Sequence, residues 1–367
     1  MKILEINVDD LNYGGVFSLI KSVVETRSQE LKFDIASIEG FQDENNKKYF
    51  EQLGCRIFYV GCTKNKLLKQ YIVYRNLTQL IKQEKYDIVH IHADTANKLF
   101  VSGFAAKACG VQKIILHAHA SGVEGKHRVI KYYVHNFFKS YLCLVGTEFV
   151  GCSDKACDWM YPKKCNTILI NNGINLNKYR YDVNERIKCR EASGLKDQFI
   201  IGHVGRFAFP KNHIFIIKIA TWLKENGFDF KIVLVGAGEL FQDIEKEVKE
   251  RGLTDEVLFW GTTDHVQNVL QIMDVFVLPS IYEGFPIAAV EAQACALPCL
   301  ISSRLTKTVK LIPEVEFLNI NDEDISAWGR AIMKFKNHNR VDTYSLLKEQ
   351  HFDISDTVQQ LLDLYKC

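Results

Sequence analysis

Two glutamates, Glu283 and Glu291, lie eight residues apart on either side of a predicted helix start. The apolar residues 275–278 before them predict a buried parallel strand that ends at Pro279. We expect the helix to begin near Pro286, because a proline in the first helical turn loses no backbone hydrogen bond there. Ligands of open α/β sheets bind beyond the carboxyl ends of the strands. This strand–loop–helix junction is therefore a candidate ligand site.

The junction offers a ligand two kinds of contact. Gly284 and the residues after it expose backbone N–H groups at a helix N-terminus, which suit an anionic or hydroxyl-rich ligand. Glu291 lies in a helix with little polar surface, where a carboxylate is costly unless it has a partner. The simpler alternative is that Glu283 only favours the helix dipole and that Glu291 faces solvent. We favour the ligand interpretation.

Two further junctions carry residues suited to phosphate. Residues 199–204 predict a strand that leads into Gly-Arg-Phe-Ala-Phe-Pro-Lys-Asn, in which Arg206 and Lys211 flank a helix start. Phosphates bind at such positions, through backbone N–H groups and basic side chains. Gly238, in Val-Gly-Ala-Gly-Glu, belongs to another glycine turn between a strand and a helix. These junctions predict an anion site, although solvated surface charges would look the same.

The first half of the chain has two candidate motifs of its own. Gly14 and Gly15 follow the first predicted strand and precede a helix. Adjacent glycines allow close approach of a ligand to the backbone, but a tight turn needs glycine as well. His117 and His119 end the fifth predicted strand and, by alternation, share one face of it. A His-x-His pair is half of a metal site, but no acidic or cysteine cluster beside it completes one.

Together these motifs resemble glycosyltransferase family 4, whose members are retaining transferases of the GT-B fold. The resemblance rests on Pro-Ser-x-x-Glu-Gly-Phe-Pro with Glu-x7-Glu, and on Gly-Arg-Phe-x-x-x-Lys-Asn. It covers nearly the whole chain and is strongest over residues 205–302. One departure is Ala296, where the family usually has glycine before Leu-Pro, and we expect it to cost only local packing freedom.

The resemblance implies a role for each motif. Arg206 and Lys211 would clamp the donor diphosphate, Glu283 would contact hydroxyls of the donor sugar, and Glu291 would hold the ribose of the nucleotide. His119 would lie near the reacting carbon of the sugar. The remaining donor-binding residues that it implies are Gly14, Gly15, Gly238, Gly284, Phe285 and Pro286. Because basic side chains and helix N–H groups can neutralise the departing diphosphate, we expect no metal and no other cofactor.

The elements that must position these residues alternate between strand and helix along both halves of the chain. Strands are predicted at residues 3–8, 33–38, 56–60, 88–92, 113–119, 149–152, 167–170, 199–204, 230–235, 257–260, 275–278, 299–302 and 316–320. This pattern predicts an α/β protein with two doubly wound Rossmann-like domains facing a cleft. The resemblance implies an acceptor-side domain at 1–173 and a nucleotide-sugar-binding domain at 174–352, with a C-terminal helix at 353–367 that returns to the first domain.

The composition is ordinary for a globular chain, with 47% hydrophobic and 25% charged residues. The 46 basic and 44 acidic residues nearly balance, which gives no reason to expect nucleic acid as a partner. The 11 cysteines form no Cys-x-x-Cys pairs, so we expect most of them to be small buried hydrophobes in a reducing compartment. No signal-peptide pattern opens the chain, and no apolar run approaches the roughly 18 residues of a spanning helix. These features predict a cytoplasmic protein.

Two predicted helices of the first half carry one-sided charge. Their basic residues include Lys64, Lys66, Lys69, Arg128, Lys131 and Lys139. In the second helix, apolar and aromatic residues recur at helical spacing, namely Ile130, Tyr133, Val134, Phe137, Phe138 and Tyr141. Covering the sheet explains the apolar periodicity but not the charge. Basic helices with interfacial aromatics favour an anionic membrane surface, so we expect peripheral attachment to the inner face of the cell membrane.

The resemblance implies transfer, with retention, of a hexose or N-acetylhexosamine from a nucleotide-diphosphate sugar, most simply a UDP-sugar. The acceptor would be a glycan on a lipid carrier, in the synthesis of capsule, exopolysaccharide or another surface glycan. One alternative is a non-catalytic sugar-nucleotide-binding protein. An NAD-type oxidoreductase is disfavoured, because Gly-x-Gly-x-x-Gly is missing after the first strand.

Overall fold

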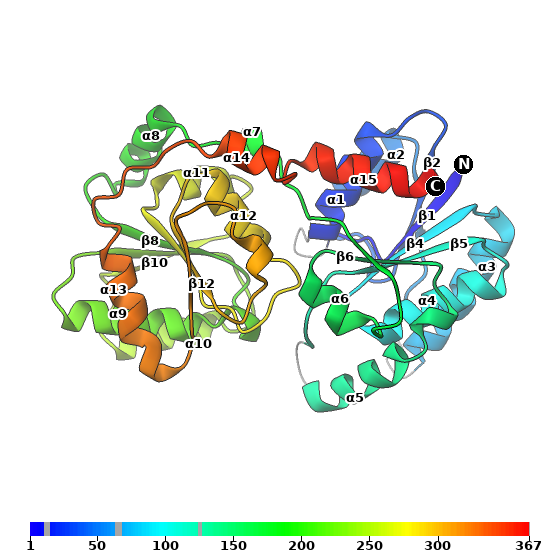
Figure 1. Cartoon of the computed structure of the whole chain (residues 1–367), viewed down its shortest axis with the longest axis horizontal. Helices are drawn as coiled ribbons and strands as arrows, with labels where there is room; N and C mark the ends of the chain where they lie inside the picture. Colours follow the sequence, from blue (N-terminus) through cyan, green and yellow to red (C-terminus); the bar gives the residue numbers. More distant parts are fainter. Residues whose placement is uncertain (11–14, 63–67, 124–126, 367) are drawn as a thin grey trace. The chain divides into compact units, whose positions relative to one another are not determined.

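A computed structural model describes residues 1–10, 15–62, 68–123 and 127–366 of the chain. The chain forms two compact units, Met1–Asn172 with Ile354–Cys367, and Gly173–Asp353. Each unit has one parallel sheet with helices on both of its faces (Figure 1). The predicted α/β class with two doubly wound sheets is therefore confirmed. Gly14, Lys64 and Lys66 lie outside the described residues.

The first unit contains a seven-stranded sheet in the order β3-β2-β1-β4-β5-β6-β7. Its strands are β1 (Lys2–Ile6), β2 (Lys32–Ser37), β3 (Arg56–Tyr59), β4 (Ile88–Ala93), β5 (Lys113–Ala118), β6 (Glu148–Gly151) and β7 (Thr167–Leu169). Its helices are α1 (Gly15–Thr26), α2 (Glu44–Gln52), α3 (Lys69–Glu84), α4 (Ala96–Ala108), α5 (Arg128–Lys139), η2 (Leu142–Leu144), α6 (Asp154–Met160) and α15 (Ile354–Lys366).

The second unit contains a six-stranded sheet in the order β10-β9-β8-β11-β12-β13. Its strands are β8 (Ile200–Val204), β9 (Lys231–Val235), β10 (Val257–Gly261), β11 (Val275–Leu278), β12 (Cys299–Ser302) and β13 (Val315–Leu318). Its helices are α7 (Leu176–Tyr179), α8 (Val183–Ser193), η3 (Phe209–Lys211), α9 (His213–Glu225), α10 (Phe241–Glu250), α11 (Val266–Ile272), α12 (Ile287–Ala294), η4 (Lys307–Val309), η5 (Asp322–Asp324), α13 (Ile325–Met333) and α14 (Tyr344–Glu349).

The strand order reverses once in each sheet. In the first unit the reversal lies between β1 and β4, and in the second it lies between β8 and β11. Ligands of doubly wound sheets bind in the crevice that opens at this reversal, beyond the carboxyl ends of the two strands. The motifs singled out in the second half of the sequence follow β8 and β11, so the topology brings them to this crevice.

Burial on both faces explains the apolar strands. Every residue of β11 and of β12 is buried, as expected for central parallel strands covered by helices on both sides. In the first unit, α15 lies beside α1 (Figure 1). Its residues Val358, Leu361, Leu362 and Tyr365 belong to the same buried cluster as residues of α1 and β1.

The chain after α12 corrects one expectation. Ala296 has a φ of 54°, in the left-handed region that glycine adopts readily. A residue with a Cβ costs about 1–2 kcal/mol in this conformation. The glycine that family members usually have here is therefore a backbone requirement at the end of the helix, and Ala296 introduces strain as well as a change in packing.

The cysteines follow the expectation in part. Five of the described free cysteines are buried, as small hydrophobes are, namely Cys55, Cys152, Cys157, Cys295 and Cys299. Cys143 and Cys165, however, form a disulfide between η2 and the segment before β7. No pattern in the sequence predicts this pair, because the two cysteines belong to no spacing motif and only the fold brings them together.

Candidate active site

Two loops of the second unit are joined by hydrogen bonds at the reversal of its sheet. One loop, residues 205–212, follows β8, and the other, residues 279–284, follows β11. The backbone N–H of Ile281 donates to the carbonyl oxygen of Pro210 over 2.8 Å. The side-chain amide of Asn212 donates to the carbonyl oxygen of Pro279 over 3.2 Å. The two motifs therefore form one local structure, although about 70 residues separate them in the sequence.

The central contact of this structure is an ion pair between two predicted site residues. The ammonium of Lys211 lies 2.6 Å from Oε1 of Glu283, and both side chains are largely buried, with 20% and 13% of their surface exposed. The hydroxyl of Ser280 donates to the same carboxylate oxygen over 2.8 Å. A partly desolvated pair interacts more strongly than a surface pair. The site therefore contains a cation and an anion side by side.

Gly238 has a structural reason to be glycine. Its φ is 158°, and a Cβ there would lie 2.4 Å from the carbonyl oxygen of Phe207. The backbone N–H of Phe207 also donates to Ala237 O over 2.9 Å, which ties the two turns together. The turn at Gly238 therefore supports the loop that carries Arg206, whose side chain is exposed. Close approach of two protein backbones accounts for this glycine without a ligand.

The residues at the start of α12 differ in how accessible they are. Gly284 is partly exposed, whereas Phe285 and Pro286 are buried. The ring of Phe285 stacks on that of Phe352, with 5.7 Å between their centroids. The Phe285 ring is thus part of the core. Any ligand contact at this position must come from the backbone.

Glu291 lies on α12 and has a hydrogen-bond partner, as a buried carboxylate requires. Tyr179 makes a side-chain hydrogen bond to it. Burial raises the pKa of the Glu291 carboxyl to about 7, against the opposing effects of Tyr179, Lys178 and Lys211. Since the charge of Lys211 is one of those that act on this carboxyl, Glu291 lies near the Lys211–Glu283 pair. At neutral pH this carboxyl is close to half protonated.

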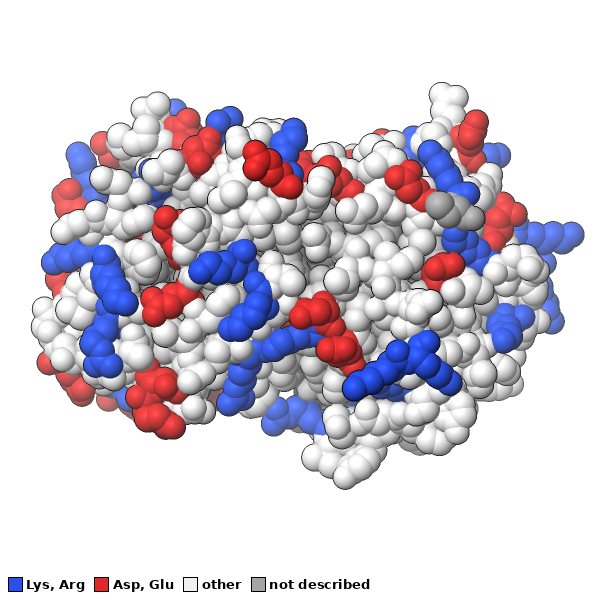
Figure 2. Space-filling model, in the orientation of Figure 1, with Lys and Arg blue, Asp and Glu red and all other residues white. Residues whose placement is uncertain are grey.

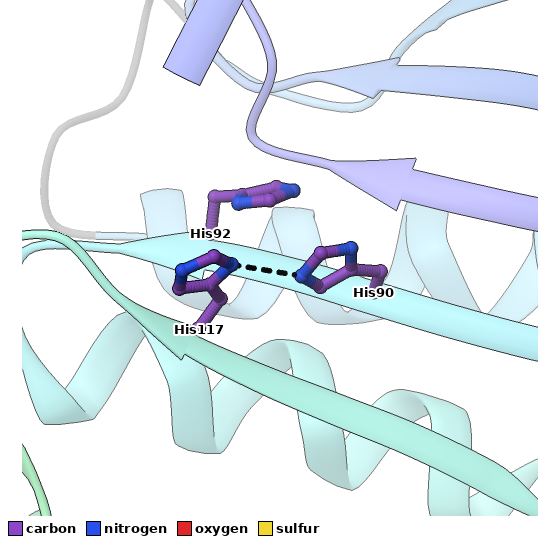
Figure 3. Close-up of side chains that lie close together, drawn as sticks. All are labelled: His90, His92 and His117. Atoms are coloured by element: carbon purple, nitrogen blue, oxygen red, sulfur yellow. Dashed lines mark hydrogen bonds between the residues drawn. The ribbon is translucent and has the colours of Figure 1, made fainter. Parts of the chain in front are cut away.

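Histidines at the ends of β4 and β5 form a largely buried group near the other sheet reversal (Figure 3). His90 and His92 come from β4, and His117 comes from β5, with ligand atoms within 4.8 Å of one another. His119 follows β5 directly, and its Nε2 lies 2.9 Å from Nδ1 of His92. Glu5 of β1 lies 2.9 Å from Nε2 of His92. The sheet register places His92 opposite His117.

Comparison with known proteins identifies the family. Residues 185–349 match the family described as glycosyl transferases group 1, and residues 14–143 match the glycosyl transferase 4-like family. The chain is 30% identical to the putative glycosyltransferase EpsF of Bacillus subtilis, over 97% of this chain and 94% of that protein. The chain belongs to the group 1 glycosyltransferases. The resemblance noted in the sequence is confirmed, and the protein is a glycosyltransferase.

Other relatives agree with this assignment. The glycosyltransferase is 28% identical to the UDP-Gal:alpha-D-GlcNAc-diphosphoundecaprenol alpha-1,3-galactosyltransferase of Escherichia coli, over 84% of this chain and 83% of that protein. Its fold matches the crystal structure of Anabaena Alr3699/HepE in complex with UDP-glucose with a TM-score of 0.76 and 17% identity, over 100% and 99% of the two chains. The predicted GT-B fold is confirmed.

The structure brings some of the predicted site residues of this glycosyltransferase together. Lys211, Glu283 and Glu291 share one site in the second unit, with Gly284 and the backbone of Phe285 beside them. Gly15 is the first residue of α1 and is exposed. Asp322 and Asp324, which formally match the Asp-x-Asp metal motif, make other contacts at a helix start. Asp324 accepts from the Asn321 backbone N–H at a helix start, while Asp322 pairs with Lys218.

Sequence reasoning missed several polar residues of the glycosyltransferase. Glu5, His90, His92 and Tyr365 surround His117 and His119, so the isolated His-x-His pair is in fact half of a larger cluster. A signal was present, because a second His-x-His pair, His90 and His92, ends the preceding strand. Neighbouring parallel strands bring such pairs side by side. Tyr365 carried no signal, because only the packing of α15 brings it to β1 and β4.

Helix α5 buries a polar side chain and exposes most of its apolar ones, which is the reverse of an ordinary surface helix. Its only fully buried residue is His135, which accepts from the backbone N–H of Ala96 and contacts Trp159 O through Nε2. The large apolar residues of α5 and the segment after it that are exposed are Val129, Ile130, Tyr132, Tyr133, Val134, Phe137, Tyr141 and Leu144. We call these residues the α5 surface. The alternative that these aromatics cover the sheet is therefore wrong for most of them.

The basic residues that the sequence predicts at a membrane surface differ in how accessible they are. Arg128 and Lys131 are exposed, but Lys139 donates to Asp158 O over 2.6 Å and Lys69 is paired with Glu39. Phe138 is half-buried against Phe100. In Figure 2 the lower right of the molecule, where α5 lies, is largely uncharged, with Lys and Arg gathered above it. Among the described residues, no helix is long and apolar enough to cross a membrane.

Proposed function

We propose that this glycosyltransferase moves a hexose or N-acetylhexosamine from a UDP-sugar to a glycan carried on a lipid diphosphate, with retention at the anomeric carbon, in the synthesis of a cell-surface polysaccharide. In this proposal residues 174–352 bind the nucleotide sugar. Residues 1–173, completed by the C-terminal helix at 353–367, bind the acceptor. The observation that carries the proposal is the Lys211–Glu283 pair, held by two joined loops where the strand order reverses.

The pair suits a ligand that has an anion on one side and hydroxyl groups on the other. A diphosphate would draw the Lys211 ammonium toward itself, with Arg206 as a second cation, because phosphate attracts both. The Glu283 carboxylate would then accept hydrogen bonds from sugar hydroxyls. Glu291 would accept from the ribose hydroxyls, and we assign a contact with the donor sugar to His119. Gly14, Gly15 and Gly284 would offer backbone N–H groups.

The proposed chemistry needs charge stabilisation at the leaving group. The bond between the anomeric carbon and the diphosphate oxygen breaks, and the acceptor oxygen bonds to that carbon on the same face of the sugar. The acceptor proton passes to a phosphate oxygen of the departing UDP. Arg206 and Lys211, already in place, would stabilise the charge that develops on the diphosphate. No metal is required in this scheme, and no other cofactor.

The relatives support this choice of donor and acceptor. The Escherichia coli relative is named for UDP-galactose and for an acceptor on diphosphoundecaprenol, and the Anabaena protein of the same fold binds UDP-glucose. By analogy, we infer a UDP-sugar donor and an undecaprenyl-diphosphate-linked acceptor for this chain. The carrier lipid would place the reaction at a membrane surface on the cytoplasmic side.

Turnover tests the proposal directly. We would measure release of UDP from UDP-glucose, UDP-galactose and their N-acetylated counterparts, with a sugar-diphospho-undecaprenol acceptor, and determine the anomeric configuration of the product by NMR. We expect one of these donors to give an α-linked product and the activity to persist in EDTA. Turnover only with a non-uridine donor would overturn the nucleotide assignment. Nucleotide binding without turnover on any acceptor would favour the non-catalytic alternative.

Donor binding should depend on pH through Glu291. Ribose hydroxyls donate to the ionised carboxylate, whose pKa is about 7, so binding should favour the ionised form. Its population rises about tenfold between pH 6 and pH 8. We therefore expect the Kd for UDP-glucose to fall about tenfold over this range and to level off above it, as measured by calorimetry. The phosphates of UDP-glucose are diesters and do not titrate here.

Two features isolate this effect. The nearby histidines do not titrate in this range, because burial lowers the pKa of His203 to about 4 and that of His213 to about 2. In Glu291→Gln the affinity should be lower and nearly independent of pH. A wild-type Kd that stays constant from pH 6 to pH 8 would show that Glu291 does not bind the ribose in its ionised form.

We further propose that the α5 surface docks on an anionic membrane. Several of its residues are more than half exposed, including Val129 at 69% and Tyr133 at 69%. A contiguous exposed apolar surface of this kind usually marks an interaction site. The basic residues Arg128 and Lys131 lie on the same helix, which adds attraction to acidic headgroups. The aromatic side chains and the charge together fit the interfacial region of a bilayer.

The protein should bind vesicles that contain phosphatidylglycerol at low salt, and bind phosphatidylcholine vesicles much less. Tyr133→Ser with Phe137→Ser should weaken this binding at least tenfold, because each buried aromatic contributes about 1.5–3 kcal/mol. Arg128→Gln with Lys131→Gln should weaken it as well, since each basic residue contributes about 1 kcal/mol near an anionic surface. Sedimentation with vesicles measures both effects.

The matched control changes two exposed apolar residues of the other unit. Val341 is 75% exposed and Leu346 is 38% exposed, and the control variant is Val341→Ser with Leu346→Ser. This variant should bind vesicles like the wild type. Hydrolysis of the donor by water, which needs no lipid acceptor, should be unchanged in the α5 variants. Equal binding of the wild type to neutral and anionic vesicles, or to neither, would contradict the docking proposal.

A further inference from the structure

A polar network lies inside the first unit, where apolar side chains would be expected. Its six members come from β1, β4, the end of β5 and α15, and are Glu5, His90, His92, His117, His119 and Tyr365. Glu5, His90, His92 and His117 have no exposed surface. Buried polar groups are costly unless they are hydrogen-bonded, so the contacts determine where each proton must lie.

The network is organised by Glu5. The hydroxyl of Tyr365 donates to one carboxylate oxygen over 2.7 Å, and Nε2 of His92 lies 2.9 Å from the other. Burial alone would raise the pKa of Glu5, but the opposing effect of His90 and His92 lowers it to about 2. Glu5 is therefore ionised. Since a carboxylate only accepts hydrogen bonds, His92 must carry its hydrogen on Nε2.

The tautomer of His92 determines the tautomer of His119. Burial, together with the neighbouring His90, lowers the pKa of His92 to about 4, so the ring is neutral. A neutral imidazole with hydrogen on Nε2 has a bare Nδ1, which accepts. That Nδ1 lies 2.9 Å from Nε2 of His119, so His119 must donate from Nε2. Burial also lowers the pKa of His119 well below its usual range, which leaves its Nδ1 with a lone pair.

A metal site is the competing interpretation, because three imidazoles so close together are a zinc donor set. The contacts argue against it. Nε2 of His90 lies 3.1 Å from Nδ1 of His117, and Nδ1 of His90 lies 2.7 Å from the Tyr365 hydroxyl (Figure 3 shows the first of these). A metal would have to take nitrogens that these bonds already use. Of the described ring nitrogens in this group, Nε2 of His117 is the buried one without a partner.

We propose that Glu5 and His92 are positioning residues that hold His119 in a single tautomer, with hydrogen on Nε2 and a bare Nδ1, so that His119 meets the donor sugar as a hydrogen-bond acceptor. The inference rests on the donor contact proposed above for His119. It makes that contact specific: Nδ1 accepts from a sugar hydroxyl or amide N–H and cannot donate to the diphosphate. A deoxy donor that lacks this hydroxyl should therefore bind more weakly.

The test is a tautomer measurement on the full-length wild-type protein by ¹⁵N NMR of its histidine rings. We expect His92 and His119 each to show a protonated Nε2 and a bare Nδ1 at neutral pH, with signals assigned from His92→Phe and His119→Gln. His135 serves as an internal standard, because the Ala96 N–H fixes it in this same tautomer. A hydrogen on Nδ1 of His119, a charged ring, or a stoichiometric metal in the purified protein would overturn the proposal.

A matched pair of variants separates positioning from packing. His92→Phe and His90→Phe replace neighbouring histidines of β4 that are equally buried, but only the first removes the acceptor for His119. In His92→Phe the His119 signals should shift to an average of both tautomers. KM for the donor should rise about tenfold, because this is the scale expected when a buried polar group is mispaired. The change in kcat should be smaller. In His90→Phe, Nδ1 of His92 can still accept from His119, so both the His119 signals and KM should change clearly less than in His92→Phe.

The outcomes separate this inference from the proposed function. If His119→Ala keeps wild-type turnover, the donor contact of His119 is wrong whatever the tautomer is. If His119 is the donor contact but its tautomer differs, the positioning role of Glu5 and His92 is wrong. Equal KM increases in His90→Phe and His92→Phe would mean that both histidines only support the core. Should neither variant fold, the wild-type spectrum still decides the question.

Discussion

Replacing Lys211 by alanine should lower kcat about 100-fold or more at saturating donor. The ammonium of Lys211 lies 2.6 Å from Glu283 with only 20% of its side chain exposed. Its charge is therefore poorly screened by water and would act strongly on a departing diphosphate. Removing one such group, already in place in the ground state, typically costs 100- to 1,000-fold in kcat. Release of UDP, with stopped-time sampling, measures the effect.

A second lysine provides the control. Lys218 lies on α9, shortly after Lys211 in the sequence. Its ammonium also lies 2.6 Å from a carboxylate, that of Asp322, but the Asp322 side chain is 74% exposed. Lys218→Ala should keep kcat within about twofold, because exposed pairs contribute little. Thermal unfolding should show that both variants are folded. Near wild-type turnover in Lys211→Ala would mean that the leaving group is not bound where we place it.

Replacing Glu283 by glutamine should lower turnover on the order of 100-fold. Glutamine keeps the shape and can still accept from Ser280, but it loses the charge that pairs with Lys211. Without the pair, both the ammonium and the sugar contact lose their fixed positions, and misplacement of this kind costs about 100-fold. The assay is again UDP release at saturating donor, with Asp322→Asn as the control that breaks the exposed pair instead.

The two losses should not add. Lys211 and Glu283 touch, so each single variant already disturbs the other residue, and residues that act as a unit show strong coupling. The double variant, Lys211→Ala with Glu283→Gln, should therefore lose far less than the product of the two single losses. Fully multiplicative losses would indicate that the two residues act in separate steps, and the ion pair would then be incidental to catalysis.

The sequence was sufficient to predict the sheets and to place the two loops of the candidate site after β8 and β11. Runs such as residues 275–278 are apolar at every position, and only a strand covered on both faces buries such a run. The spacing between Glu283 and Glu291 and the motif from 205 to 212 place ligand groups directly after strands. Local patterns of this kind survive into the fold, because they depend on neighbours in the chain.

Other features were decided only by the tertiary structure. The pairing of Lys211 with Glu283, and the link from Glu5 through His92 to His119, join side chains from different strands. Apolar periodicity in the sequence also did not predict that α5 buries His135 and exposes Tyr133. A helical repeat identifies an apolar face, but not whether that face packs on the sheet or lies on the surface. The local sequence thus determines which residues lie at strand ends. Packing determines which of them meet, since contacts between distant segments depend on strand order and register.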